Sequence, residues 1–186
     1  DSFMASVSTV SSQLARDRAT LDKATFLARY GHLRPGTYDI LSPRYDEAPE
    51  LYFDWDQRPS LEETAEPFSM TLPQMREIVQ LLDAHGLQSN PVELFNFLQA
   101  GIELRELAKF HFTRNLSDVL ALVSSCGAEW GFSKESLAYC DIAVFRELHV
   151  AAADPKGLLA RSIEEGAARY SETLALSLPP VIAQPE

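Results

Sequence analysis

The chain has 186 residues, with 27 acidic against 16 basic side chains and a formal net charge of −11 at pH 7. This length suits one domain of ordinary size, and 46% hydrophobic with 10% aromatic residues is typical of a folded protein. Because so acidic a surface repels phosphate backbones and anionic lipid, we expect neither a nucleic acid nor a membrane as partner. The two cysteines form no disulfide framework, so we expect a cytoplasmic location.

Helical spacing dominates the first thirty residues. Apolar residues over 4–21 recur every three or four positions, which predicts one amphipathic helix. Asp22 is placed to cap a second, short helix, and Gly31 stands where a C-terminal cap belongs. Residues 31–60 are rich in Gly and Pro and show no sustained period, so we expect a long ordered loop there. Its anchors would be the aromatic residues Tyr38, Tyr45, Tyr52, Phe53 and Trp55.

The second half of the chain again reads as helix. Between Asn90-Pro91 and Gly127 the apolar spacing predicts one long helix, with a bend near Gly101 or Asn115. Further caps and openings are expected at Thr71, at Ser133 or Ser136, at Asp141 and at Asp154-Pro155. Alternation with period two, typical of strands, is not convincing anywhere. The sequence therefore predicts an all-α, irregular multi-helix domain, with one long central helix and a long Pro/Gly-rich ordered loop.

The two ends suggest a piece of a longer polypeptide. Asp1 begins what looks like a helix in progress, and residues 177–186 form a proline-rich exit that cannot continue a helix. We therefore expect residues 1–186 to be a single helical domain of a larger multidomain protein.

The usual catalytic signatures are absent from the sequence. Glycines do not cluster into a phosphate cradle, Cys126 and Cys140 lack the spacing of zinc ligands, and no nucleophile motif is present. We therefore expect no catalytic residue, no metal ligand and no cofactor in this chain, and no catalysis by the chain alone.

The segment from Phe26 to Glu47 carries the most information. Gly31 and Gly36 permit backbone conformations that other residues resist, and Pro35 and Pro43 stiffen the loop between them. A loop of this kind can hold side chains in fixed positions. The candidates for substrate binding are His32, Arg34, Tyr38, Asp39 and Arg44.

Two interpretations of the arginines remain open. Each guanidinium can bind a phosphate or carboxylate through two hydrogen bonds, or it can pair with nearby carboxylates and only lock the loop. Arg44 has ready partners in Asp46 and Glu47, so we favour a structural role for it. We favour a functional role for Arg34.

The same segment resembles the phosphoenolpyruvate-utilising phosphotransferases, a family that includes phosphoenolpyruvate synthase-like proteins and rifampicin phosphotransferases. The matching residues are Tyr30-Gly31-His32, Pro35-Gly36, Asp39 and Pro43-Arg44. Leu33-Arg34 before the Pro-Gly pair and Thr37-Tyr38 after it depart from the antibiotic-modifying members, which implies another branch with another acceptor.

A second stretch, Leu104 to Phe110, resembles an Arg-Glu-x-x-Lys helix of the same family. Arg105 and Lys109 are four residues apart and thus lie near one helical face, which adds them to the candidates for substrate binding. Pairing of these cations with Glu103 or Glu106 on a solvated face is the alternative.

The resemblance implies a modular, ATP-dependent kinase-like transferase. ATP and Mg²⁺ would bind an N-terminal ATP-grasp-like domain, a mobile domain would carry a phosphohistidine, and this chain would be the middle helical domain. Its partners would be those two domains and an unknown small-molecule acceptor. The alternative is a non-catalytic helical module that docks partner domains or proteins.

Overall fold

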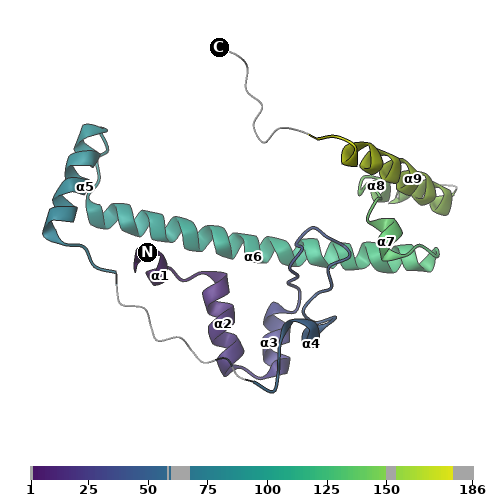
Figure 1. The fold of residues 1–186 in the computed structure, drawn as a ribbon, viewed down its shortest axis with the longest axis horizontal. Helices are drawn as coiled ribbons and strands as arrows, with labels where there is room; N and C mark the ends of the chain where they lie inside the picture. The colour runs from purple at the N-terminus through teal and green to yellow at the C-terminus, as the bar shows by residue number, and fades with distance from the viewer. Residues whose placement is uncertain (1, 58, 60–67, 150–153, 178–186) are drawn as a thin grey trace, which may run out of the picture. The chain divides into compact units, whose positions relative to one another are not determined.

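A computed structural model of the chain describes residues 2–57, 59, 68–149 and 154–177. Every regular element within these ranges is a helix (Figure 1), which confirms the all-α prediction. The helices are α1 (Ser2–Ser6), α2 (Val10–Thr20), α3 (Lys23–Tyr30), α4 (Pro49–Tyr52), α5 (Leu72–Ala84), α6 (Pro91–Glu129), α7 (Lys134–Leu137), α8 (Val144–His149) and α9 (Pro155–Leu174). In this part of the chain, no helix is long and apolar enough to cross a membrane.

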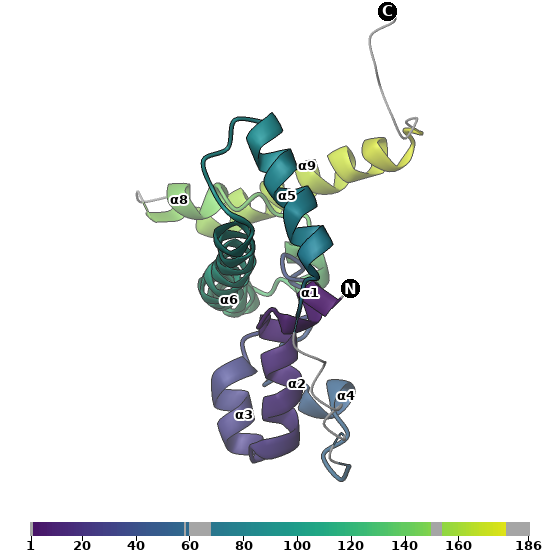
Figure 2. The same cartoon turned by 90° about the vertical axis from the view of Figure 1, so that its left-hand side faces the viewer.

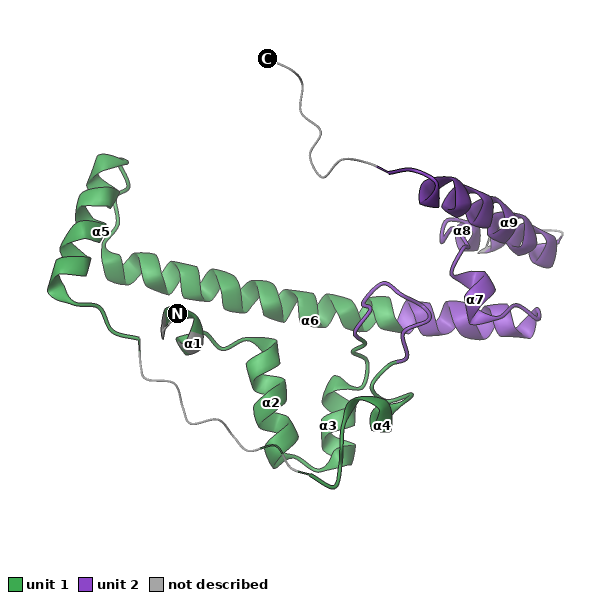
Figure 3. Cartoon of the chain, in the orientation of Figure 1, with its two compact units in different colours: residues 1–34, 44–117 green, residues 35–43, 118–186 purple. Residues whose placement is uncertain are grey.

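The chain divides into two compact units, which Figure 3 shows in green and purple. Unit 1 comprises residues 1–34 and 44–117, and unit 2 comprises residues 35–43 and 118–186. Each unit is described by itself below. That residues 1–186 form one domain stays a prediction.

The prediction of one helix over residues 4–21 is wrong. α1 ends at Ser6 and α2 begins at Val10, because Thr9 adopts an extended conformation and caps the second helix. The Thr9 hydroxyl accepts a hydrogen bond from the Ser12 backbone N–H at 3.1 Å. α2 and α3 then lie side by side in unit 1 (Figure 2).

Local capping signals place most of the other helices correctly. The Asp22 carboxylate caps α3, Thr71 and Gln74 form a capping box at α5, and the Asp154 carboxylate caps α9. Ser133, and not Ser136, caps α7. The helix predicted to start at Asp141 begins at Val144, after a turn in which Asp141 accepts from the backbone N–H of Ala143.

The long helix α6 has 39 residues and continues through Gly101 and Asn115. It also continues past Gly127, where we expected it to stop. A side chain at Gly127 would lie 2.8 Å from Leu137 Cδ2, so this glycine serves close packing within unit 2. The helix ends before Gly131, which has the positive φ of 84° that favours glycine.

An aromatic cluster holds the irregular segment of unit 1 against α3. Phe26 is fully buried, and its ring centroid lies 5.1 Å from that of Phe53 and 5.8 Å from that of Trp55. Tyr45 packs on Phe53 at 4.9 Å. The predicted aromatic anchoring is thus confirmed for these residues, and the segment also contains the unforeseen short helix α4.

The expectation is wrong for Tyr38, which belongs to unit 2 and is 74% exposed. In that unit the core consists of Ile40, Val123, Leu137, Val144 and Leu159. Ile40 therefore anchors the stretch 35–43 of the loop, and α8 packs beside α9.

Gly31 and Gly36 serve close packing and not an unusual backbone conformation. Gly31 has an ordinary helical φ of −56°, but a side chain there would lie 2.9 Å from Asp46 Cβ. A side chain at Gly36 would lie 2.9 Å from Asp39 Cβ. Both glycines thus allow the loop to pack on itself.

Candidate functional site

Two of the predicted loop residues are buried in unit 1. His32 is 5% exposed, and its ring centroid lies 4.8 Å from that of Phe110 on α6. Arg34 is 7% exposed, and its Nη2 and Nε atoms donate to the Ser117 hydroxyl at 3.1 and 3.3 Å. Arg34 therefore lies buried against α6.

Arg44 is tied to its neighbours in sequence. Its guanidinium donates twice to the Asp46 carboxylate, at 2.9 and 2.8 Å, and its backbone N–H donates to Glu47 at 3.1 Å. This is the ion pair that the structural interpretation of Arg44 predicted. In unit 2, the Asp39 carboxylate accepts from the backbone N–H of Leu41 at 2.8 Å.

The two predicted cations of α6 lie on the surface of unit 1. The Arg105 side chain is 75% exposed and pairs with Glu106 at 3.1 Å, as the alternative interpretation expected. Lys109 is also exposed. The seven predicted site residues thus fall into both units, and none of them lines the cavity described next.

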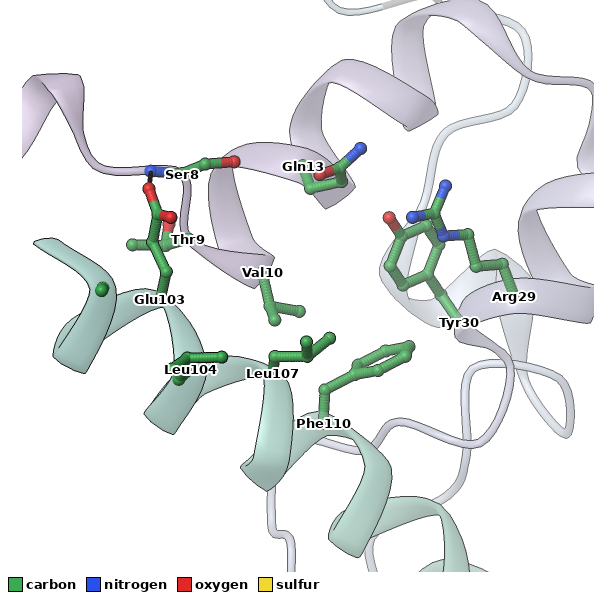
Figure 4. A pocket seen from close by; sticks show the side chains of 11 residues that line it. Ser8, Thr9, Val10, Gln13, Arg29, Tyr30, Glu103, Leu104, Leu107 and Phe110 are labelled. Carbon is green, nitrogen blue, oxygen red and sulfur yellow. Dashed lines mark hydrogen bonds between the residues drawn. The ribbon is translucent and has the colours of Figure 1, made fainter.

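Unit 1 contains a cavity of about 420 Å³, which we call the unit 1 cavity. It lies between the start of α2, the end of α3 and the middle of α6 (Figure 4). Its volume falls within the range typical of small-molecule sites. The lining residues are Ser8, Thr9, Val10, Gln13, Arg29, Tyr30, Ala100, Glu103, Leu104, Leu107 and Phe110.

The cavity has an apolar side, to which α6 contributes most. Leu104, Leu107 and Phe110 follow one another at spacings of three, which places them near one helical face. Figure 4 shows Leu107 beside Val10, which comes from the first turn of α2, and the Phe110 ring directed toward Tyr30. The Phe110 and Tyr30 ring centroids lie 5.8 Å apart in an edge-to-face arrangement.

The opposite side of the cavity is polar and is organised by Asp17. One oxygen of this carboxylate accepts from the Tyr30 hydroxyl and from Arg29 Nη1, each at 2.8 Å. Burial, together with the bond to Asp17, raises the pKa of Tyr30 from 10.0 to about 12. Tyr30 is therefore a neutral hydrogen-bond donor at any physiological pH.

Two further groups on this side have hydrogen-bonding capacity to spare. Within the described ranges, Nε and Nη2 of Arg29 and the side-chain amide of Gln13 take part in no hydrogen bond. The Arg29 side chain is 50% exposed, so these donors are accessible. Figure 4 shows the Gln13 amide and the Arg29 guanidinium on the same side of the cavity, near Tyr30.

Glu103 is ionised but already engaged. Its carboxylate accepts from the Ser8 backbone N–H at 2.9 Å and from the Gln99 amide at 3.0 Å. These hydrogen bonds, the one from Gln99 first, lower the pKa of Glu103. Glu103 therefore fastens the start of α2 to α6 and fixes one wall of the cavity (Figure 4).

Unit 2 has a hollow of another kind. Its lining comes from the end of α6 and from the region of α8, and includes Leu122, Cys126, Phe145 and Arg146. Burial, with Glu129 nearby, raises the pKa of the Cys126 thiol, so the thiol is protonated and unreactive. Arg146 is the one cation in the described lining of this hollow and no amide side chain accompanies it there, whereas the unit 1 cavity has both Gln13 and Arg29 and is the better candidate site. In the described parts of the chain, no three His, Cys, Asp or Glu side chains come together as metal ligands.

Gln13, Arg29 and Leu107 were not among the predicted site residues. The sequence held one relevant signal, because Arg29 directly precedes the Tyr30-Gly31 pair of the family resemblance. Helical spacing predicts which face of a helix a residue occupies. It does not tell which part of that face neighbouring helices leave uncovered.

Comparison with protein-family models, with curated proteins and with solved structures finds no match to this chain.

Proposed function

We propose that this chain is the acceptor-binding helical domain of a multidomain ATP-dependent phosphotransferase resembling phosphoenolpyruvate synthase. The observation that carries the proposal is the unit 1 cavity, because Tyr30 of the Tyr30-Gly31-His32 match lines it. The cavity combines an apolar wall with a few convergent polar groups, which is the usual composition of a small-molecule site.

In this proposal the chemistry is divided between domains. ATP and Mg²⁺ bind a neighbouring ATP-grasp-like domain and supply the phosphoryl group that a phosphohistidine of the mobile domain carries. Transfer breaks the phosphorus–nitrogen bond and forms a phosphorus–oxygen bond to an acceptor hydroxyl, whose proton is released. The part played by this chain is to hold the acceptor in one orientation and away from water.

The buried loop residues then act as positioning residues and not as ligands of the acceptor. His32 packs against Phe110, whose ring lines the cavity. Arg34 is bonded to Ser117, two turns further along α6. Both contacts fix α6 relative to the end of α3, and the cavity lies between these two elements.

One observation favours the second candidate function, the docking of neighbouring domains. Phe97 is 74% exposed and Phe112 is 54% exposed, both on the unit 1 part of α6. Large apolar side chains exposed in this way are common at interfaces. The ATP-grasp-like and phosphohistidine domains of the same polypeptide would be the partners.

The test uses the full-length polypeptide and a substitution that fills the cavity. A screen of small hydroxyl compounds first identifies an acceptor that is phosphorylated with ATP. Ala100 is exposed and lines the cavity, so Ala100→Trp places a large side chain there. Acceptor phosphorylation should fall at least about tenfold. ATP-dependent phosphorylation of the mobile-domain histidine should stay normal.

Phe97→Ser is the matched control, because it changes an exposed residue of the same helix that does not line the cavity. It should leave transfer unchanged. Normal transfer with Ala100→Trp, combined with a loss in Phe97→Ser, would replace acceptor binding with domain docking.

A further inference from the structure

We propose that the unit 1 cavity binds an uncharged, largely apolar molecule with one oxygen that accepts hydrogen bonds from Arg29 and Gln13. That this molecule is the phosphoryl acceptor rests on the function proposed above. The binding site itself rests on the geometry of the cavity and can be tested alone.

The walls of the cavity select an apolar body. Val10, Leu104, Leu107 and Phe110 form one side, and the Tyr30 ring adds an aromatic surface at 5.8 Å from the Phe110 ring. Burying an apolar molecule of matching size between such walls is favourable, at about 25 cal/mol per Å² of apolar surface removed from water. A ring system suits the edge-to-face pair of Tyr30 and Phe110.

The side-chain donors that Arg29 and Gln13 leave unused within the described ranges favour a ligand with one hydrogen-bond-accepting oxygen. Nε and Nη2 of Arg29 and the amide N–H groups of Gln13 have no partner within the described ranges, and they lie on the same side of the cavity (Figure 4). A ligand carbonyl or hydroxyl oxygen can accept from both residues. Tyr30 does not compete, because its hydroxyl donates to Asp17.

The charges around the cavity argue against an anionic ligand. Asp17 already compensates Arg29 at 2.8 Å. Arg16, whose Nη2 lies 3.4 Å from the Ser8 hydroxyl, is balanced by the ionised Glu103 on the same edge. These four charges cancel. Arg114, which donates to the Arg29 carbonyl oxygen at 3.4 Å, adds one positive charge near Phe110. The net charge of −11 on the whole chain repels an anion over longer distances.

A fluorescent ketone tests the proposal on the isolated chain. Prodan is an uncharged naphthyl ketone whose emission shifts to the blue in apolar surroundings and to the red when its carbonyl accepts hydrogen bonds. We expect saturable binding to the wild-type chain, and binding at least about tenfold weaker to Ala100→Trp. Leu174→Trp, at a 69% exposed position of α9 that lines neither the unit 1 cavity nor the unit 2 hollow, is the matched control and should bind prodan normally.

Arg29→Met tests the polar half of the site. Loss of its hydrogen bonds should weaken prodan binding about three- to tenfold and shift the bound emission further to the blue. The anion 1-anilinonaphthalene-8-sulfonate, of similar size, should bind more weakly than prodan and should be insensitive to Arg29→Met. Far-ultraviolet circular dichroism checks that each variant is folded, and Ala100→Leu replaces Ala100→Trp if the latter is not.

Each contrary result has a definite meaning. Tighter binding of the sulfonate, lost in Arg29→Met, would show that the site takes anions and would overturn the inference. Prodan binding that neither substitution at Ala100 weakens would show that the cavity is not the site. Specific prodan binding without acceptor phosphorylation by the full-length polypeptide would instead support the site and count against the proposed function.

Discussion

Arginines on the two sides of Tyr30 have opposite surroundings. Arg34 of the loop is bonded to Ser117 of α6, and Arg44 is bonded to Asp46 within the loop, so both guanidinium groups are engaged in fixing the loop. Arg29, one residue before Tyr30, is half exposed and keeps two nitrogen donors directed to a cavity. The Gly- and Pro-rich loop thus supports the fold of unit 1, whereas the helix end beside it lines the candidate site.

Replacement of Arg34 should give the largest effect. Arg34→Ala leaves a buried void and an unsatisfied Ser117 hydroxyl, and should lower the free energy of unfolding by about 3 kcal/mol. Arg29→Ala, which breaks a half-exposed ion pair, should cost about 0.5 kcal/mol. Urea unfolding monitored by circular dichroism measures both. If both substitutions lowered the free energy of unfolding equally, Arg34 and Arg29 would not differ in their structural roles.

A side chain at Gly31 should be nearly as damaging. Gly31→Ala brings a methyl group to 2.9 Å from Asp46 Cβ and against the Leu27 carbonyl oxygen, so helix α3 or the loop must move. We expect a loss of about 2 kcal/mol in the free energy of unfolding, typical of overpacking. An unchanged urea midpoint would show that the loop is not closely packed on the end of α3.

Tyr30→Phe should have a moderate, pH-dependent effect. Losing the hydrogen bond to Asp17 should cost about 1 kcal/mol near neutral pH. The pKa of about 12 in the folded protein lies above the ordinary value of 10.0, so the folded state holds this proton more tightly.

The contribution of Tyr30 to stability is therefore complete below pH 10 and is lost as the pH rises to about 12. Unfolding experiments across this window should show a smaller decline in Tyr30→Phe than in the wild type. The same decline in both proteins would assign the raised pKa to some other tyrosine.

The smallest effect has the opposite sign. Gly101 on α6 lies beside the cavity residue Ala100, and a side chain there would meet no atom within 4 Å. Gly101→Ala should raise the free energy of unfolding by about 0.5–1 kcal/mol, because alanine has the higher helix propensity. Thermal unfolding measures the gain. A loss instead would indicate that α6 needs the flexibility of glycine at this point.

The elements could be predicted from the sequence wherever a local signal decides them. Asp22, Thr71 and Asp154 cap helices through bonds to residues three positions on, so their neighbours in sequence suffice. Thr9 offered the same signal, but the apolar spacing over 4–21 outweighed it and concealed the break before α2. A glycine after a long apolar run is typical of a helix end, so the sequence predicted a stop at Gly127. Gly127 instead makes room for Leu137, ten residues away, and this contact depends on the tertiary fold.

The site depends on contacts that sequence spacing does not encode. Arg34 lies among Gly and Pro residues and looks exposed, yet its hydroxyl partner is 83 positions away. Arg29 looks like an ordinary helix residue, and only the fold brings Gln13 and Leu107 near it. Residue types alone could not show which guanidinium has donors to spare, because burial and partners are set by tertiary packing.

Nuclear magnetic resonance of the two guanidinium groups tests this contrast most directly. The chain labelled with ¹⁵N is titrated with 2-acetylnaphthalene, an uncharged aryl ketone, and the Nε–H signals are assigned with Arg29→Met and Arg34→Lys. We expect the Arg29 Nε–H and Gln13 amide signals to move with the ketone, whereas the Arg34 Nε–H signal stays in place because Ser117 holds it. Movement of the Arg34 signal while those of Arg29 and Gln13 stay unchanged would place ligand binding in the loop and contradict a site at Arg29 and Gln13.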